Sequence, residues 1–189
     1  MKKSNPQRAS KSNRECDPSW MARAIELARA AAAQGEVPVG AIVVHAGRIV
    51  GMGHNRRERE QNPCSHAEIE AILEAARELG SWRLEGCSLF VTLEPCPMCL
   101  GACQQARIEE VVYGASDPKG GALSLGYRLH EDARTNHRFI VRLEEQAECG
   151  EVLKEFFGER RRKTKAEAPS AAKSPPSPPA DRVSKTRRR

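Results

Sequence analysis

The sequence predicts an α/β fold in which helices cover both faces of a mixed five-stranded sheet. Apolar runs with the length and composition of strands alternate with longer segments whose apolar residues repeat at helical spacing. The runs 41–44 and 48–51 flank His45-Ala46-Gly47, which is typical of a hairpin. A hairpin followed by strands that are separated by helices is typical of a mixed sheet with helices on each side.

The first helix is expected at 20–33, an alanine-rich segment that runs up to Gly35. Asp17 can cap this helix, and Pro18 suits the first helical position because an amide hydrogen there would have no partner. After the hairpin we expect three further strands, at 89–93, 111–113 and 139–143.

A last helix is expected after the fifth strand, because its apolar residues form one stripe. These residues are Val152, Leu153, Phe156 and Phe157. The basic run Arg160, Arg161, Arg162 and Lys163 continues the same pattern and is expected to extend this helix.

The net charge of +6 is unevenly distributed along the chain. Residues 159–189 carry +8 and residues 1–17 carry +3, whereas residues 18–158 carry −5. We therefore expect a disordered basic arm (1–17), one folded domain (18–158), and a basic helix extension that continues into a disordered Pro/Ser/Arg-rich tail (159–189). Such arms suit a polyanionic partner, although they can also serve only to keep a protein soluble.

Cysteine usage indicates a reducing compartment. The seven cysteines are an odd number, and no apolar signal-peptide core follows Met1-Lys2-Lys3. No apolar run is long enough to span a bilayer. We therefore expect a cytoplasmic protein whose thiolates are available to metals, without a membrane partner.

The most specific signal for chemistry is His66-Ala67-Glu68 followed by Pro95-Cys96-Pro97-Met98-Cys99. One imidazole and two thiolates are three zinc ligands, and zinc with three protein ligands keeps a fourth position for water, as in catalytic sites. Glu68 is a carboxylate beside the ligands that can move protons to and from that water. The pattern H-x-E…P-C-x-x-C matches the signature of zinc nucleobase deaminases.

Both halves of this motif are expected at helix starts. Asn62-Pro63 or Ser65 can cap a helix that ends at Gly80 and has His66 and Glu68 in its first turn. Cys96 and Cys99 are three residues apart, so on the first turn of a second helix they share a face. The N-terminus of a helix also favours a thiolate over a thiol.

Simpler interpretations exist for each half. Glu68 can close a capping box with Ser65, and a single C-x-x-C can be redox-active or structural. Cys64 or Cys103 can supply a fourth ligand and close the site. Those two residues and Cys87 are more typical of small buried or partly buried side chains than of ligands.

From Met21 to about Arg162 the chain resembles the bacterial-type tRNA-specific adenosine deaminases of the cytidine/deoxycytidylate deaminase superfamily. The resemblance rests on stretches 36–41, 55–56, 66–69, 91–96, 113–117 with Lys119, and 136–138. It implies a three-layer α/β/α cytidine-deaminase-like fold, one Zn²⁺ per subunit, a homodimer, and conversion of the wobble adenosine of a tRNA anticodon to inosine. Loop 118–126 and segment 126–134 depart from the usual family sequence.

The resemblance also assigns roles to residues. His66, Cys96 and Cys99 would bind zinc, and Glu68 would take the proton of the zinc-bound water, which attacks C6 as hydroxide, and pass it to ring N1. The base and its neighbouring nucleotides would be contacted by Asn55, the Ala67 amide, Val37, Pro38, Leu93, Asp117 and Lys119. The stem phosphates would be contacted by Arg160, Arg161, Arg162 and Lys163.

Two other functions remain compatible with the motif. A deaminase of a free base or nucleoside, such as guanine or cytosine, shares the zinc motif but needs no phosphate-binding arm. A non-catalytic RNA-binding protein stabilised by zinc would require a fourth protein ligand.

Overall fold

The computed structural model describes residues 18–167; the predicted arm 1–17 and the tail 168–189 lie outside the described residues. A five-stranded mixed sheet with strand order β2-β1-β3-β4-β5 forms the middle layer, which confirms the expected fold class. Its strands are β1 (Gly40–His45), β2 (Arg48–His54), β3 (Cys87–Val91), β4 (Glu110–Tyr113) and β5 (Ile140–Leu143). The helices are α1 (Pro18–Ala33), α2 (Arg57–Glu60), α3 (Ala67–Glu78), α4 (Pro97–Ala106) and α5 (Ala147–Glu167).

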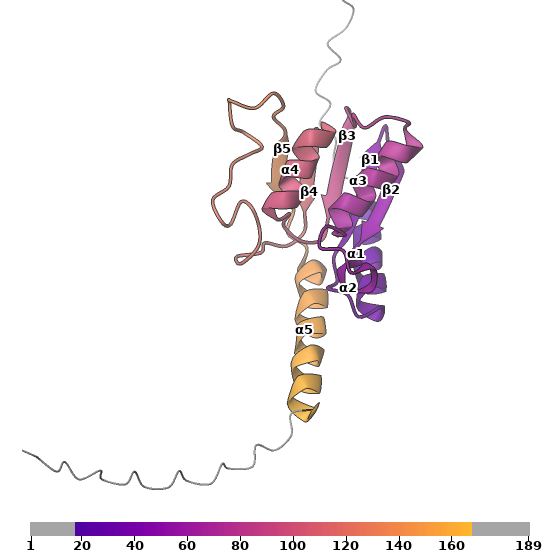
Figure 1. Cartoon of the computed structure of the whole chain (residues 1–189), viewed down its shortest axis with the longest axis vertical. Coiled ribbons are helices and arrows are strands. Elements are labelled where there is room, and N and C mark those ends of the chain that lie inside the picture. Colours follow the sequence, from indigo (N-terminus) through magenta and orange to yellow (C-terminus); the bar gives the residue numbers. More distant parts are fainter. Residues whose placement is uncertain (1–17, 168–189) are drawn as a thin grey trace, which may run out of the picture.

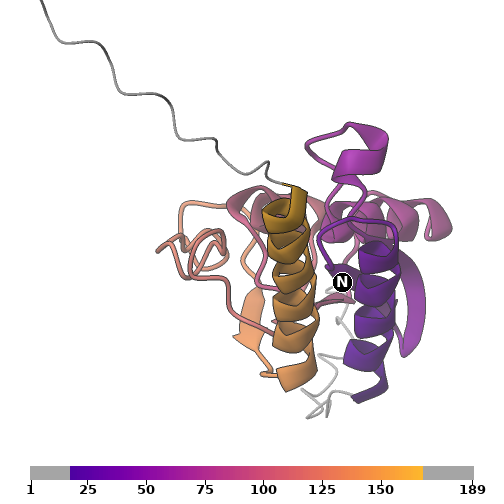
Figure 2. The same cartoon turned by 90° about the horizontal axis from the view of Figure 1, so that it is seen from below.

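Alternation along the strands divides the core into two halves. Ala41, Val43, Leu89 and Val91 face one side, where they pack with buried residues of α3 and α4. The intervening residues face the other side, where they pack with Met21 and Ala24 of α1 and Cys149 of α5; they are Ile42, Val44, Phe90 and Val112. Because side chains alternate across a strand, this pattern produces three layers. Figure 1 shows α3 and α4 in front of the sheet, and Figure 2 shows α1 and α5 side by side.

Strand directions bring several connections to one edge of the sheet. β1 is antiparallel to both β2 and β3, while β4 is parallel to β3 and β5 is parallel to β4. The start of β1 and the ends of the other four strands therefore meet at the same edge. α5 begins at this edge and continues beyond the body of the protein (Figure 1).

The third strand was expected two residues too late. β3 ends at Val91, so residues 92–96 form a connection and the strand does not run directly into the next helix. Pro95 has no amide hydrogen to continue a strand ladder. The connection between β4 and β5, residues 114–139, contains turns and no helix, unlike the helix-separated strands that we expected. Hydrogen bonds hold it to the body instead, among them those of Gln104, whose side-chain amide donates to Leu129 O and His137 O at 3.3 and 3.2 Å.

None of the helices between residues 18 and 167 combines the length and the apolar character needed to cross a lipid bilayer.

The start of α3 is held close to β2 by glycine. A Cβ added at Gly53 would overlap the backbone of Ala67 and Ala71, and one added at Gly51 would overlap that of Ala71 and Ala75. The absence of these two side chains lets the helix lie directly on the strand, and this contact fixes the position of residues 66–68.

We therefore predict that Gly53→Ala destabilises the fold by roughly 1–3 kcal/mol, because the added methyl group forces α3 away from β2. The measurement is the free energy of unfolding in urea. Gly150→Ala is the matched control, since a Cβ there meets nothing within 4 Å and the residue lies inside α5. That variant should gain about 0.5–1 kcal/mol from helix propensity. Equal stabilities for the two variants would contradict the close-packing argument.

Candidate active site

The helix α3 begins at the predicted histidine. His66 is its N-cap residue, with extended backbone angles and no side-chain capping hydrogen bond, so its imidazole is free for other partners. The predicted caps at Asn62-Pro63 and at Ser65 are both wrong, and so is the capping box of Ser65 with Glu68. The Ser65 hydroxyl is instead hydrogen-bonded to Glu60 Oε2 at 3.1 Å. Gly80 follows the end of the helix in a left-handed conformation, with φ of 62°, as its position suggested.

The helix α4 begins at the predicted cysteines. Cys96 is the N-cap residue, Pro97 is the first helical residue, and Cys99 is buried in the first turn. Nδ1 of His66 lies 3.7 Å from Cys96 Sγ and 3.5 Å from Cys99 Sγ. Tetrahedral zinc with ordinary Zn–N and Zn–S bonds would hold such ligand atoms about 3.5–3.8 Å apart. The two helix starts therefore meet, and their three donor atoms are spaced to share one ion.

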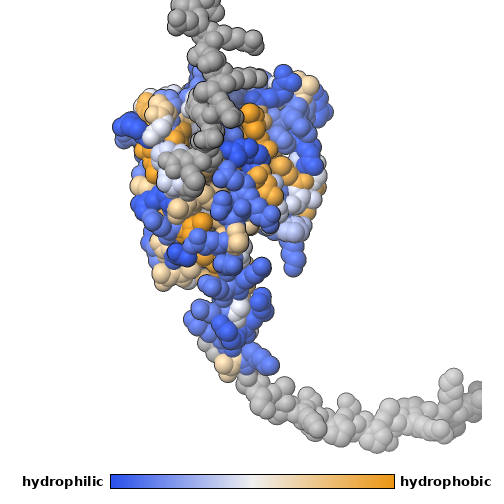
Figure 3. All heavy atoms as spheres, turned by 180° about the vertical axis from the view of Figure 1, so that it is seen from behind, coloured by the Kyte–Doolittle hydropathy of each residue, from blue (hydrophilic) through white to orange (hydrophobic). Residues whose placement is uncertain are grey.

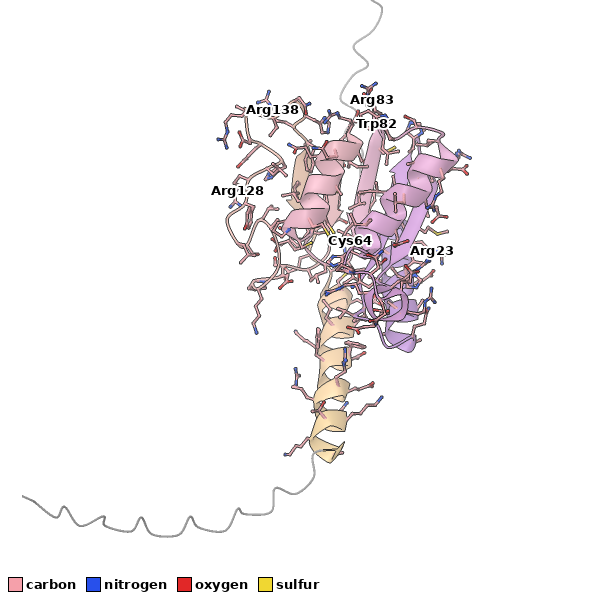
Figure 4. All side chains as sticks on the ribbon, in the orientation of Figure 1. Arg23, Cys64, Trp82, Arg83, Arg128 and Arg138 are labelled. Carbon is pink, nitrogen blue, oxygen red and sulfur yellow. The ribbon has the colours of Figure 1, made fainter. Side chains whose placement is uncertain are left out.

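Neither candidate fourth ligand belongs to this cluster. Among residues 18–167, the donor group comprises only His66, Cys96 and Cys99. Cys64 is exposed, contrary to the expectation of a buried or partly buried side chain, and Figure 4 shows it near the start of α3. Cys87 and Cys103 are buried, as expected. A metal bound here would thus have three protein ligands, which is typical of catalytic zinc.

The electrostatics of the cluster favour one thiolate. The pKa of Cys96 is lowered to about 4 because the Cys99 thiol donates a hydrogen bond to it and His66 adds a second, although burial opposes the shift. The pKa of His66 is raised, chiefly by its hydrogen bond to Cys96. The exposed amides at the start of α4 also favour the thiolate form of Cys96. The residues thus provide a soft anionic donor of the kind that zinc binds.

Glu68 lies beside the donor cluster without belonging to it. Its side chain is buried, with 4% of the residue exposed. Burial raises the pKa of Glu68 to about 7, and the neighbouring Cys96 thiolate contributes to this increase. A carboxyl group with such a pKa can both accept and donate a proton near neutrality.

Asn55 and Ala67 contact each other. Asn55 directly follows β2, and its Oδ1 accepts the Ala67 amide hydrogen at 3.0 Å. The Asn55 side-chain nitrogen makes no hydrogen bond among the hydrogen bonds of residues 18–167. The side chain is thus oriented by α3 and keeps a donor for another partner.

The three apolar residues predicted to contact a base differ in exposure. Pro38 is fully buried, whereas Val37 and Leu93 are partly buried and pack against the core. As the structure stands, only Val37 and Leu93 have surface for an apolar contact.

The loop after β4 places Asp117 and Lys119 at the same edge of the sheet. Asp117 is partly buried, and its Oδ1 accepts the Lys119 amide hydrogen at 3.0 Å in a tight turn. The Lys119 side chain is exposed. The loop thus presents one cation to solvent near the donor cluster.

The basic run lies on α5, which continues to Glu167. Arg160, Arg161, Arg162 and Lys163 are all exposed. Phe157 is also exposed, and together with Arg160, Arg161, Thr164 and Lys165 it lines a shallow hollow. Figure 3 shows that the projecting part of α5 is predominantly hydrophilic.

Two buried carboxylates near this edge were not predicted. Glu36 accepts the amide hydrogens of Glu58 and Arg59 at 3.2 and 2.7 Å, which holds the segment after Asn55. Glu94 accepts hydrogen bonds from the loop that carries Asp117. The sequence signal for both was a glutamate within an otherwise apolar segment. Such a residue is expected to be buried, and a buried carboxylate requires hydrogen-bond partners.

Comparisons with known proteins identify the family of this chain. A family model described as MafB19-like deaminase matches residues 16–161. The tRNA-specific adenosine deaminase of Bacillus subtilis is 48% identical over 151 residues, which cover 79% of this chain and 94% of that protein. The tRNA-specific adenosine deaminase of Haemophilus influenzae is 42% identical over 161 residues, covering 84% of this chain and 93% of that protein.

Two solved structures of deaminases are also similar to this chain. A structure from work on A-to-I editing by tRNA:A34 deaminases at the wobble position of transfer RNA has a TM-score of 0.69 at 40% identity, and the match covers 72% of this chain and 100% of that chain. A guanine deaminase from Bacillus subtilis has a TM-score of 0.53 at 28% identity, covering 83% of this chain and 99% of that chain. The matched family model and the identities over most of both chains show that this chain belongs to the tRNA-specific adenosine deaminase family.

Proposed function

We propose that the protein hydrolyses the wobble adenosine of a tRNA anticodon to inosine and ammonia. The observation that carries this proposal is the convergence of His66, Cys96 and Cys99 beside a buried Glu68, in a chain of this family. The solved relative from work on wobble-position editing supports the substrate. We also propose, from the family resemblance, a cytoplasmic homodimer with one Zn²⁺ in each subunit.

The donor set supports zinc as the cofactor. One imidazole nitrogen and two sulfurs, spaced by 3.5–3.7 Å between nitrogen and sulfur, fit a small tetrahedral ion. When bound, zinc would supply a Lewis acid and a water that is acidic enough to become a nucleophile near neutral pH.

Glu68 is suited to proton transfer during this hydrolysis. It can take a proton from the attacking water and deliver it to ring N1 of adenine, which makes C6 more reactive. It can then take the proton of the new C6 hydroxyl group and pass it to the amino group, which leaves as ammonia when the C6–N bond breaks. One carboxyl group can perform each transfer because burial keeps its pKa at about 7, near the operating pH.

The remaining residues would hold and orient the base. The free side-chain nitrogen of Asn55 can donate to an acceptor on the purine edge, and Val37 and Leu93 can contact its faces. An extruded base needs both kinds of contact, since it loses its stacking and pairing partners when it leaves the RNA.

The anticodon stem would lie along α5 and the loop after β4. Lys119 and the exposed run from Arg160 to Lys163 can contact phosphates, which contribute affinity and register but no base specificity. A free base would not need these cations.

The first prediction from the proposed function concerns Glu68. Glu68→Gln should retain zinc and fold but lose about 10²–10⁴ in the rate of inosine formation, because an amide cannot transfer the proton. The measurement is inosine formation in a stem-loop with a wobble adenosine, with free guanine, cytosine and adenosine in parallel. Glu78→Gln, at an exposed position of the same helix, is the control. Ammonia release from a free base, with no inosine in the stem-loop, would exclude the RNA substrate and keep the zinc chemistry.

The second prediction concerns the metal. The wild type should bind one zinc ion per chain after dialysis, and His66→Ala or Cys99→Ala should reduce this content strongly. Cys64→Ser and Cys103→Ala should leave it unchanged, since neither thiol belongs to the donor cluster. Elemental analysis of the purified proteins is the measurement. Loss of zinc from either control would indicate a fourth protein ligand and a structural site.

The third prediction concerns α5. Replacing Arg160, Arg161, Arg162 and Lys163 together by Gln should weaken stem-loop binding, because counterion release is lost. The slope of log K against log salt should fall by about one for each phosphate contact removed. The control removes the same charge from exposed arginines at other positions: Arg48, Arg77, Arg83 and Arg138. An equal loss of affinity in both variants would show that only net charge matters.

A further inference from the structure

A single buried carboxylate holds the loop that follows β4. Glu94 lies in the connection between β3 and α4, and only 3% of the residue is exposed. Its Oε2 accepts the Asp117 amide hydrogen at 2.9 Å and the Ser124 hydroxyl hydrogen at 2.6 Å. Its Oε1 accepts the Ser124 amide hydrogen at 2.8 Å. The two ends of the segment 117–124 are thus tied to the same side chain.

The backbone beside Glu94 reinforces this attachment. The Glu94 amide donates to Ala115 O, and Pro95 O accepts the Ala122 amide hydrogen, both at 2.8 Å. A Cβ added at Gly121 would overlap the Glu94 carboxylate, so the middle of the loop lies directly on it. Within residues 18–167, the described hydrogen bonds from segment 117–124 to earlier parts of the chain all end on Glu94 or Pro95.

The attached loop carries the cation assigned to the RNA. Lys119 is exposed, and its backbone is fixed only through the turn with Asp117, whose amide is itself bound to Glu94. Without Glu94, the remaining hydrogen bonds of the loop are largely internal, such as that from the Gly121 amide to Asp117 O at 2.9 Å. Apart from the bond of the Ala122 amide to Pro95 O, the position of Lys119 relative to Cys96 therefore depends on Glu94.

We propose that Glu94 is a positioning residue for RNA binding: it holds segment 117–124 in the shape that presents Asp117 and Lys119 to the nucleotides next to the target adenosine. This inference rests on the proposed function, because it takes the partner of the loop to be the anticodon stem-loop. Glu94 does not belong to the donor cluster. It acts through the loop, and it joins the loop to the connection that also carries Cys96.

The test compares Glu94→Gln with Glu109→Gln. In both residues a carboxylate accepts backbone amide hydrogens, but Glu109 holds Gly86 at the start of β3, with a bond of 3.0 Å. Glu94→Gln should raise KM for the stem-loop about tenfold and change kcat less than threefold, with zinc content unchanged. Glu109→Gln should leave KM, kcat and zinc content at wild-type values. A fall in kcat with KM unchanged in Glu94→Gln would overturn the proposal.

A double-mutant cycle separates positioning from general stability. If Glu94 acts through Lys119, the double variant Glu94→Gln with Lys119→Gln should bind the stem-loop with the same affinity as the single variant that binds it less tightly. Additive losses would overturn the proposal, because they would mean that Glu94 does not act through this loop.

How firmly segment 117–124 is held can be measured by proteolysis, without any measurement of catalysis. Trypsin should cut after Lys119 at least tenfold faster in Glu94→Gln than in the wild type or Glu109→Gln, at a temperature where all three are folded. An unchanged cleavage rate would exclude the attachment of the loop by Glu94. Should Glu94→Gln not fold, Ser124→Ala replaces it, since that variant loses only the 2.6 Å hydroxyl bond and should show smaller changes in the same directions. Absence of inosine formation by the wild type would refute the proposed function, whereas the proteolysis result would still report on the loop.

Discussion

The close contact of α3 with β2 is the constraint on which the site depends. Gly51 and Gly53 let the helix backbone lie directly on the strand, so His66 is fixed above the sheet edge where β3 ends. α4 begins at the same edge with Cys96. Two helix N-termini, each with a partial positive charge, therefore face one small space. This arrangement favours a thiolate in the space, and the thiolate in turn can compensate the charge of a cation.

Three buried glutamates show how environment separates structural from chemical roles. Glu36 and Glu94 are 2% and 3% exposed, and their carboxylates accept amide hydrogens, from α2 in the case of Glu36 and from the loop after β4 in the case of Glu94. Glu68 is equally buried at 4%, but hydrogen bonds from its own amide and the Cys99 thiol do not offset its burial, and its pKa is raised to about 7. Burial alone would raise the pKa of Glu94 as well, but hydrogen bonds from Ser124 and Asp117 lower it. The same residue type thus serves as an anchor in two places and can exchange protons in the third.

Patterns within short stretches of sequence predicted the features of the fold and of the site that depend on neighbouring residues. Apolar periodicity and turn residues located the strands and long helices, and the spacing of His66, Cys96 and Cys99 predicted the cluster of donors. The cap of α3 was misplaced because Ser65 bonds to Glu60 of α2. The role of Glu94 could not be predicted, since its partners Asp117 and Ser124 lie 23 and 30 residues further along the chain. Such pairings are set by how strands are ordered in the sheet.

The geometry of α5 relates the basic run to the site. Cys149 and Val152 are buried, so the first turns of the helix are fixed on the sheet next to α1. The later turns are exposed and carry cations, with Arg160 placed 5.6 Å from the centre of the Phe156 ring. Neighbouring cations on one helix repel each other, and a bound phosphate backbone would relieve that repulsion. Since the helix begins at the edge where the donor cluster lies and continues beyond the body, a polyanion bound along its later turns would be held near that edge (Figure 1). Under the proposed function, the fixed base of α5 would thus convert a sequence-independent attraction for phosphate into a defined placement of the RNA beside the donor cluster.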